Sequence, residues 1–168
     1  MSGFESERKT PDYSVIINEV QNTFSENREI ILATSYKDRV TSRTVSFVNK
    51  DLKIYFISWE HNKKIRQIAN NPRVALTLLN IQIEGRAKVL GKPTDYQDVG
   101  DLFRAKFSDR WFDAFSQIPH MVLVEIEVEY LVKFENINRR FHLQNIDLVN
   151  KVVHQMRIED KDNPNYPM

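Results

Sequence analysis

A short cationic stretch in the middle of the chain has residue types that could hold a phosphate. Lys63 and Lys64 are expected in the first turn of a short helix, and Arg43 and Ser58 lie on predicted strands before it. A helix N-terminus carries about half a positive charge, which makes lysines there unfavourable. A bound anion would reverse that sign, because free N–H groups and both ammonium groups would point at it. The segment therefore indicates a phosphate site.

Each of these residues also has an explanation without a ligand. Both lysines could be solvated surface charges, with Asn62 acting only as a helix cap. Arg43 could pair with a neighbouring carboxylate, and Ser58 could simply end its strand. Arg66, one turn further along the helix, is expected to be a surface charge. The charge pattern alone leaves both explanations open.

Length and composition bound the class of protein. A chain of about 150 residues buries roughly 70% of its unfolded surface, so we expect the 168 residues to form one domain. Residues 1–11 and about 144–168 are expected to be tails or extensions of it. A net charge of +1 argues against a sequence-blind nucleic-acid binder, which would be strongly basic. The absence of cysteine excludes disulfides and thiolate ligands, and fits a reducing cytoplasm.

Several familiar catalytic motifs are missing. The four glycines cannot build a dinucleotide-binding or P-loop motif, and neither HExxH nor GxSxG occurs. The histidines stand alone in the sequence, so no metal site and no hydrolase is indicated. No apolar run has the length of a membrane span, and the first residues lack a cleavable leader. We therefore expect a soluble cytoplasmic protein without a membrane or nucleic-acid partner. The histidines are His61, His120, His142 and His154.

The hydrophobic pattern predicts a sheet of short strands. A first helix is expected over Tyr13–Phe24, with Asp12 as its cap, and a short second helix over Asn62–Asn70. Alternation and short polar turns favour antiparallel pairing. Because barrel closure removes exposed strand edges, the pattern predicts a mainly β barrel of six or seven strands with peripheral helices. The strands are expected at Glu29–Tyr36, Val40–Lys50, Leu52–Ser58, Val74–Leu79, Ile81–Leu90, Met121–Val128 and Tyr130–Asn136.

Aromatic residues recur every fourth position in a later helix, which Thr94-Asp95 is expected to cap and Ser108-Asp109 could break in two. Packing in the core or between subunits is the expected role of this stripe, and the alternative is a wall over a substrate pocket. After Leu143 the pattern is ambiguous, because Ile146–Ile158 fits a strand or a helix. The aromatic residues of the stripe are Phe103, Phe107, Trp111 and Phe115.

Six short motifs occur in order over about sixty residues, and their order and spacing resemble a known family. That family is the FMN-binding split barrel typified by pyridoxamine 5'-phosphate oxidase. Each motif is short, so the resemblance depends on the ordered set. The motifs are Leu32-Ala33-Thr34, Arg43-Thr44-Val45, Phe56-Ile57-Ser58, Lys63-Lys64, Asn71-Pro72-Arg73-Val74 and Glu84-Gly85-Arg86-Ala87.

The resemblance implies a homodimeric split barrel with FMN at the subunit interface and a small-molecule substrate. It assigns the FMN phosphate or ribityl hydroxyls to Arg43, Ser58, Lys63 and Lys64. It places Thr44, Val45 and Ser46 along the ring or ribityl chain, flanked by Ile57. Asn80 stands where the oxidases have a flavin-contacting glutamine. The alternatives are that Val45 and Ile57 are core residues and that Asn80 is a turn residue.

The second half of the chain departs from the oxidases. Their R-x-H-x-R stretch, which grips pyridoxal phosphate, is matched only faintly by Arg139-Arg140-Phe141-His142. The resemblance thus implies a divergent FMN-binding oxidoreductase with an unknown acceptor, in which the flavin does the redox chemistry and no side chain need be catalytic. The alternative is a non-enzymatic flavin or haem binder for storage, sensing or stress protection.

Overall fold

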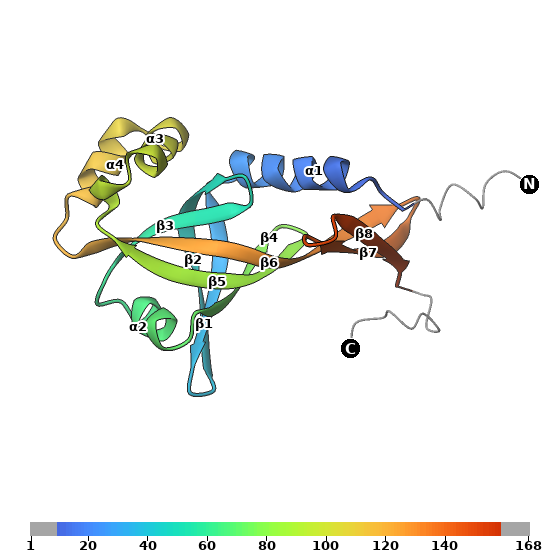
Figure 1. Ribbon diagram of the computed structural model, residues 1–168, viewed down its shortest axis with the longest axis horizontal. Coiled ribbons are helices and arrows are strands. Elements are labelled where there is room, and N and C mark those ends of the chain that lie inside the picture. The colour runs from blue at the N-terminus through green and yellow to red at the C-terminus, as the bar shows by residue number, and fades with distance from the viewer. Residues whose placement is uncertain (1–9, 159–168) are drawn as a thin grey trace, which may run out of the picture.

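The computed structural model describes residues 10–158 (Figure 1). Within that range the chain forms four α-helices, a short 3-10 helix at Pro93–Asp95 and eight strands. The helices are α1 (Tyr13–Glu26), α2 (Lys63–Asn70), α3 (Gln97–Lys106) and α4 (Asp109–Ser116). The strands are β1 (Glu29–Tyr36), β2 (Arg39–Lys50), β3 (Lys53–Trp59), β4 (Arg73–Leu78), β5 (Ile81–Gly91), β6 (Met121–Ile137), β7 (Arg140–Asp147) and β8 (Val152–Arg157).

The strands form one antiparallel sheet that closes on itself. Their order is β3-β2-β1-β4-β5-β6, and a further pairing of β3 with β6 completes a six-stranded barrel. This confirms the predicted split-barrel fold class. Beyond the barrel, β7 pairs with β6 and β8 with β7, so the described residues contain eight strands and not the expected six or seven. The expected boundary near residue 144 falls inside β7.

The two strands expected at Met121–Val128 and Tyr130–Asn136 are one long strand, β6. One edge of β6 pairs with β5 from Leu123 to Lys133. The other edge pairs first with β3, over residues 121–126, and then with β7, over residues 131–137. The pairing of β5 with β6 continues across a register shift, a bulge, between Glu84 and Gly85. A Cβ atom at Gly85 would come closer than 3.0 Å to the carbonyl oxygen of Glu127, so the bulge requires glycine here.

The main core fills the barrel. Helix α1 buries Ile16, Val20 and Phe24 against it, and Phe24 meets Phe47 of β2 edge to face at 6.3 Å. The predicted cap of α1 is confirmed, because Ser14 N–H donates to Asp12 Oδ1 at 2.8 Å. Figure 1 shows α1 lying along one side of the sheet.

A second core lies outside the barrel under α3 and α4. Phe103 and Phe112 are buried there against Val48, Tyr55 and Leu123 of the sheet. The expected break between the two helices is confirmed, since Ser108 Oγ caps α4 by accepting from the backbone N–H of Trp111 at 3.1 Å. The cap expected at Thr94-Asp95 is wrong. Those residues belong to the 3-10 helix, and α3 begins after Tyr96.

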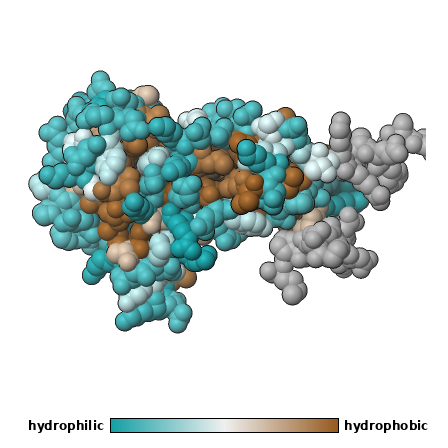
Figure 2. All heavy atoms as spheres, in the orientation of Figure 1, coloured by the Kyte–Doolittle hydropathy of each residue, from teal (hydrophilic) through white to brown (hydrophobic). Residues whose placement is uncertain are grey.

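The surface is mainly hydrophilic, with apolar patches on the face shown in Figure 2. Large apolar side chains that stay exposed include Ile31, Val40 and Leu79, all on β1, β2 or the β4–β5 turn. Within residues 10–158 no helix has both the length and the apolar character needed to cross a bilayer.

Candidate functional site

The barrel is split between β2 and β3, and this split organises the site. The two strands pair only from Phe47 with Phe56 to Lys50 with Lys53. Beyond that point β2 keeps only β1 as a partner, while β3 keeps only β6. Helix α2 follows β3 and packs against β1 and β5, with Ile65 and Ile68 buried in the core. The polar residues predicted for the phosphate lie around this helix.

Arg43 points inward at this end of the barrel and is held in a neutral cage. Its Nη1 donates to the carbonyl oxygen of Leu32 at 3.2 Å and to Thr34 Oγ1 at 2.7 Å, and its Nη2 donates to Thr41 Oγ1. All of these acceptors are uncharged. Burial lowers the pKa of Arg43, and among the described residues no carboxylate pairs with it. The guanidinium charge is therefore fixed in place but not neutralised.

Gln67 orients that cage. Its Oε1 accepts from the hydroxyls of Thr34 at 2.7 Å and Thr41 at 2.8 Å, and its Nε2 donates to the carbonyl oxygen of Arg39 at 3.0 Å. Because both hydroxyl protons are directed to Gln67, the hydroxyl lone pairs are left to accept from Arg43. Sequence reasoning gave these three polar residues no role, although Thr34 belongs to the first of the six family motifs. Thr34 and Thr41 also lie at inward-facing positions of predicted strands.

Lys64 is the second cation at this end of the barrel. It is half-buried, and the pKa of its ammonium group is lowered first by burial and then by the charge of Arg43. No ion pair or hydrogen bond of Lys64 is present within residues 10–158. Two nearby cations without a counter-charge repel each other, and a bound anion would remove that cost.

Ser58 completes this group, which we call the cation cradle: Arg43, Ser58, Lys64 and the N-terminus of α2. Ser58 is buried, and its Oγ accepts from Asn62 Nδ2 at 3.2 Å. Because the Asn62 amide is turned toward Ser58, the first turn of α2 has no side-chain cap.

The structure separates the two predicted lysines. Lys63 is exposed and lines a groove outside α2 with Arg39 and Arg66, whereas Lys64 faces Arg43. The expected surface position of Arg66 is what the structure shows.

On the outer side of the same strands lies a pocket of about 800 Å³, which we call the outer pocket. The side chains of Thr44 and Ser46 line it, opposite Phe107 and Trp111, whose rings stack at 4.5 Å. The Phe47 N–H donates to the carbonyl oxygen of Arg28, on the side of β2 that faces β1. Backbone groups point to alternate sides along a strand, so those of Thr44 point to the opposite side, toward the split. The cradle and the outer pocket thus lie on the two faces of β2.

The remaining predicted residues lie apart from the cradle. Val45 is buried in the main core, and Ile57 packs on the α3–α4 core. Asn80 lies in the β4–β5 turn, where its Nδ2 donates to the carbonyl oxygen of Phe134 at 2.6 Å. That contact is the one expected of a turn residue. Its neighbour Leu79 lies at the rim of the outer pocket.

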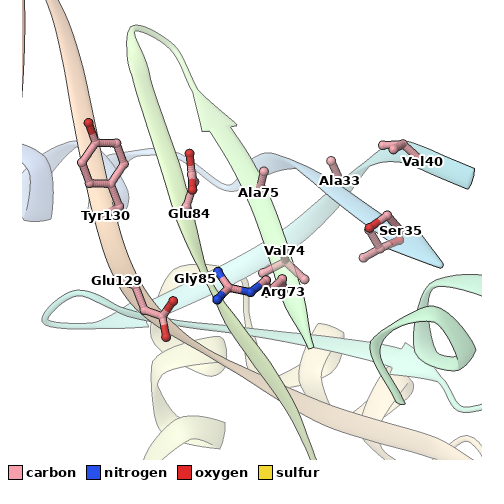
Figure 3. Close-up of a pocket in the computed structure, with 11 residues that line it drawn as sticks. Ala33, Ser35, Val40, Arg73, Val74, Ala75, Glu84, Gly85, Glu129 and Tyr130 are labelled. Atoms are coloured by element: carbon pink, nitrogen blue, oxygen red, sulfur yellow. The ribbon is translucent and has the colours of Figure 1, made fainter. Parts of the chain in front are cut away.

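A second pocket of about 500 Å³ continues along the outer face of β1 and β4 (Figure 3). The register pairs Ala33 with Ala75 in this pocket and Ile31 with Thr77 in the outer pocket, so the two hollows adjoin. Figure 3 shows the side chains of Glu84 and Tyr130 beside it on β5 and β6. Small residues at its base allow another molecule to approach the sheet closely.

A closed six-stranded barrel, split beside a cationic helix start, defines a split-barrel protein, and the cation cradle lies at its split. The family model described as pyridoxamine 5'-phosphate oxidase matches residues 16–133, and the chain belongs to this family. The match covers every cradle residue and all six barrel strands except the last residues of β6.

Individual relatives carry different descriptions. General stress protein 26 of Bacillus subtilis (strain 168) is 29% identical over 107 residues, which cover 58% of this chain and 73% of that protein. A pyridoxamine 5'-phosphate oxidase-related, FMN binding protein from Nostoc punctiforme PCC 73102 superposes with a TM-score of 0.56 at 14% identity, covering 89% of this chain and 98% of that one. HutZ, the haem storage protein of Vibrio cholerae, superposes with a TM-score of 0.59 at 17% identity, covering 69% and 92%. At these identities the two structures share the fold with this chain.

Proposed function

We propose that this protein binds FMN and acts as a flavin-dependent oxidoreductase on a small organic acceptor. The observation that carries the proposal is the pair of cations at the split. Arg43 and Lys64 are partly buried close together, beside an uncapped helix start, and neither has a carboxylate partner among the described residues. A phosphomonoester would supply the missing charge and accept from the helix N–H groups and Ser58.

The outer pocket suits the other end of the cofactor. Its volume of about 800 Å³ falls within the range of small-molecule and cofactor sites. Thr44 and Ser46 offer polar groups on one side, and Phe107 and Trp111 offer flat apolar surface on the other. The ribityl chain would pass the edge of β2 at the split. When bound, the flavin supplies the redox chemistry, and these residues position it and limit access of water.

The same face supports the proposal of a homodimer. Ile31 is 49% exposed and Leu79 71% exposed, and both border the outer pocket. Apolar side chains gathered around an open pocket are typical of a surface that a partner covers. A second copy would close the pocket over the flavin and leave the acceptor to bind beside it. The Nostoc relative, described as FMN binding, supports the cofactor assignment.

The second candidate is a non-enzymatic binder of flavin or haem. It is favoured by HutZ, a haem storage protein with the same fold. The same barrel can therefore serve storage, and the cation cradle could accept a haem propionate in place of a phosphate.

One titration series separates the candidates. Purified protein is titrated with FMN, riboflavin and haem, with flavin fluorescence and haem absorbance as readouts. We expect FMN to bind at least about tenfold tighter than riboflavin, because each charge-assisted hydrogen bond to the phosphate contributes about 1.5–3 kcal/mol. Equal affinity for the two flavins would contradict the phosphate assignment. Haem binding without flavin binding would favour storage. FMN binding without oxidation of NAD(P)H in a separate turnover assay would favour a non-enzymatic flavin binder.

A further inference from the structure

Three metal-ligating side chains meet at one corner of the barrel, where β3 ends and β6 begins. Ligand atoms of Glu60, His61 and His120 all lie within 4.8 Å of one another. Two are imidazole nitrogens and one is a carboxylate oxygen. His120 is remote from the other two in sequence, so no local spacing motif predicts that the three residues come together. None of the three belongs to the cradle or the outer pocket.

Backbone pairing between β3 and β6 positions the three residues of this corner. Trp59, the last residue of β3, pairs with Met121, the first residue of β6. This places Glu60, which follows Trp59, beside His120, which precedes Met121. Glu60 N–H donates to the carbonyl oxygen of His120 at 2.8 Å. The ring of His61 is held edge to face against Trp59, with ring centroids 4.8 Å apart. The three donor groups are thus brought together by sheet pairing.

The two distances from the Glu60 carboxylate to the imidazoles are close to those of a coordination shell, whereas the two imidazoles, at up to 4.8 Å, would have to move closer together. Zinc–ligand bonds of about 2.0–2.2 Å put the ligand atoms of a tetrahedral ion about 3.3 Å apart. His61 Nε2 lies 3.3 Å from Glu60 Oε1. His120 Nδ1 lies 2.6 Å from the same oxygen, a hydrogen bond that would open by less than 1 Å to admit the ion. The side chains are 39–59% exposed, so they can make this adjustment.

We propose that Glu60, His61 and His120 form a binding site for a divalent transition-metal ion such as Zn²⁺, with water as the fourth ligand. Two imidazoles and one carboxylate are donors that zinc, nickel and copper accept, whereas calcium and magnesium select oxygen ligands. The ion would tie the β3–α2 turn to the start of β6. The site stands on its own geometry and does not depend on flavin binding.

The test uses the full-length protein without a histidine tag, after treatment with EDTA. We expect calorimetry to show one Zn²⁺ bound per chain and no comparable heat with Mg²⁺. His61→Ala and His120→Asn should each weaken Zn²⁺ binding at least about tenfold, since even groups behind the ligands contribute that much. Asparagine is chosen at position 120 because the residue has a φ of 67°, which asparagine tolerates.

The matched control is His154→Ala, an exposed histidine on β8. It should keep the affinity of the unmodified protein. Co²⁺ provides a second readout, because visible absorption bands of a tetrahedral complex should appear in the unmodified protein and in His154→Ala and vanish in the two site variants. Circular dichroism checks that each variant is folded. The proposed site would be overturned by the absence of saturable Zn²⁺ binding. It would also be overturned if folded His61→Ala bound Zn²⁺ as tightly as the unmodified protein. The three side chains would then only contact one another.

Discussion

Lys64 lies close enough to Arg43 for the guanidinium charge to lower the pKa of the lysine, although the two residues come from different elements. Within residues 10–158 neither side chain has a carboxylate partner. The cage around Arg43 consists only of carbonyl, hydroxyl and amide groups. The protein therefore holds two like charges near each other, an arrangement that an anionic ligand stabilises.

Replacing Lys64 with alanine should weaken FMN binding about 10- to 100-fold while leaving riboflavin binding nearly unchanged. The reason is that only FMN carries the phosphate that Lys64 would contact. Lys63→Ala is the matched control, because Lys63 is the adjacent lysine but faces the outer groove. Fluorescence titration of both variants with both flavins measures the effect. An equal loss for both lysines would mean that their charge acts only at long range.

Glycine 85 should be hard to replace. In Gly85→Ala the new Cβ would approach the carbonyl oxygen of Glu127, a backbone atom that cannot move without shifting β6. We expect the free energy of unfolding to fall by about 1–3 kcal/mol, as in other overpacked sites. Urea denaturation measures it. Lys88→Ala, at an exposed position of the same strand, should stay within about 0.5 kcal/mol. A stable Gly85→Ala variant would show that the bulge can relax.

Lys106 should make stability depend on pH. Burial, with a smaller contribution from the charge of Arg28, lowers the pKa of Lys106 to about 8 from 10.5. Its Nζ donates to the carbonyl oxygen of Phe24 and lies 4.0 Å from the ring centroid of Phe47. Between about pH 8 and 10.5 the folded chain releases this proton while the unfolded chain still holds it. The unfolded state then binds more protons, so stability rises with pH across this window.

Comparison with Lys106→Met isolates that effect from other titrating groups. From pH 7 to pH 10 the free energy of unfolding of the unmodified protein should gain about 1–2 kcal/mol relative to the variant, after allowance for solvent screening of a half-buried amine. Urea titrations at several pH values measure it. Lys88→Met serves as the control for the substitution itself. A constant difference between the two proteins would show that Lys106 is solvated in the folded state.

A charge on the outer face should separate the proposed dimer. Ile31→Glu places a carboxylate at the border of the outer pocket, where a second copy is proposed to pack. We expect light scattering to show a monomer, and FMN affinity to fall with it because the pocket stays open. Val149→Glu, at an 88% exposed position in the turn between β7 and β8, should leave both properties unchanged. A dimeric Ile31→Glu variant would place the interface elsewhere.

The barrel strands were predictable because short segments rich in apolar and β-branched residues lie between short polar turns. The expected ranges of β1 to β5 agree with the structure within about two residues, a usual uncertainty at element ends. β6 was predicted as two strands, since its pattern changes where the strand leaves the barrel and gains a new partner. β7 was not predicted as a strand, and β8 lies in the segment Ile146–Ile158, whose pattern fitted a strand or a helix.

The sequence by itself determined the family motifs, most of the barrel strands and the presence of Ser58 and Lys64 near one helix start. Periodicity and local charge are properties of neighbouring residues, so they can be read without coordinates. Only the tertiary structure decided that Lys64 and not Lys63 faces Arg43, that Gln67 orients the cage, and that His61 and His120 meet. These relationships depend on strand register and on which face of a helix packs inward, and pairing between distant segments sets both.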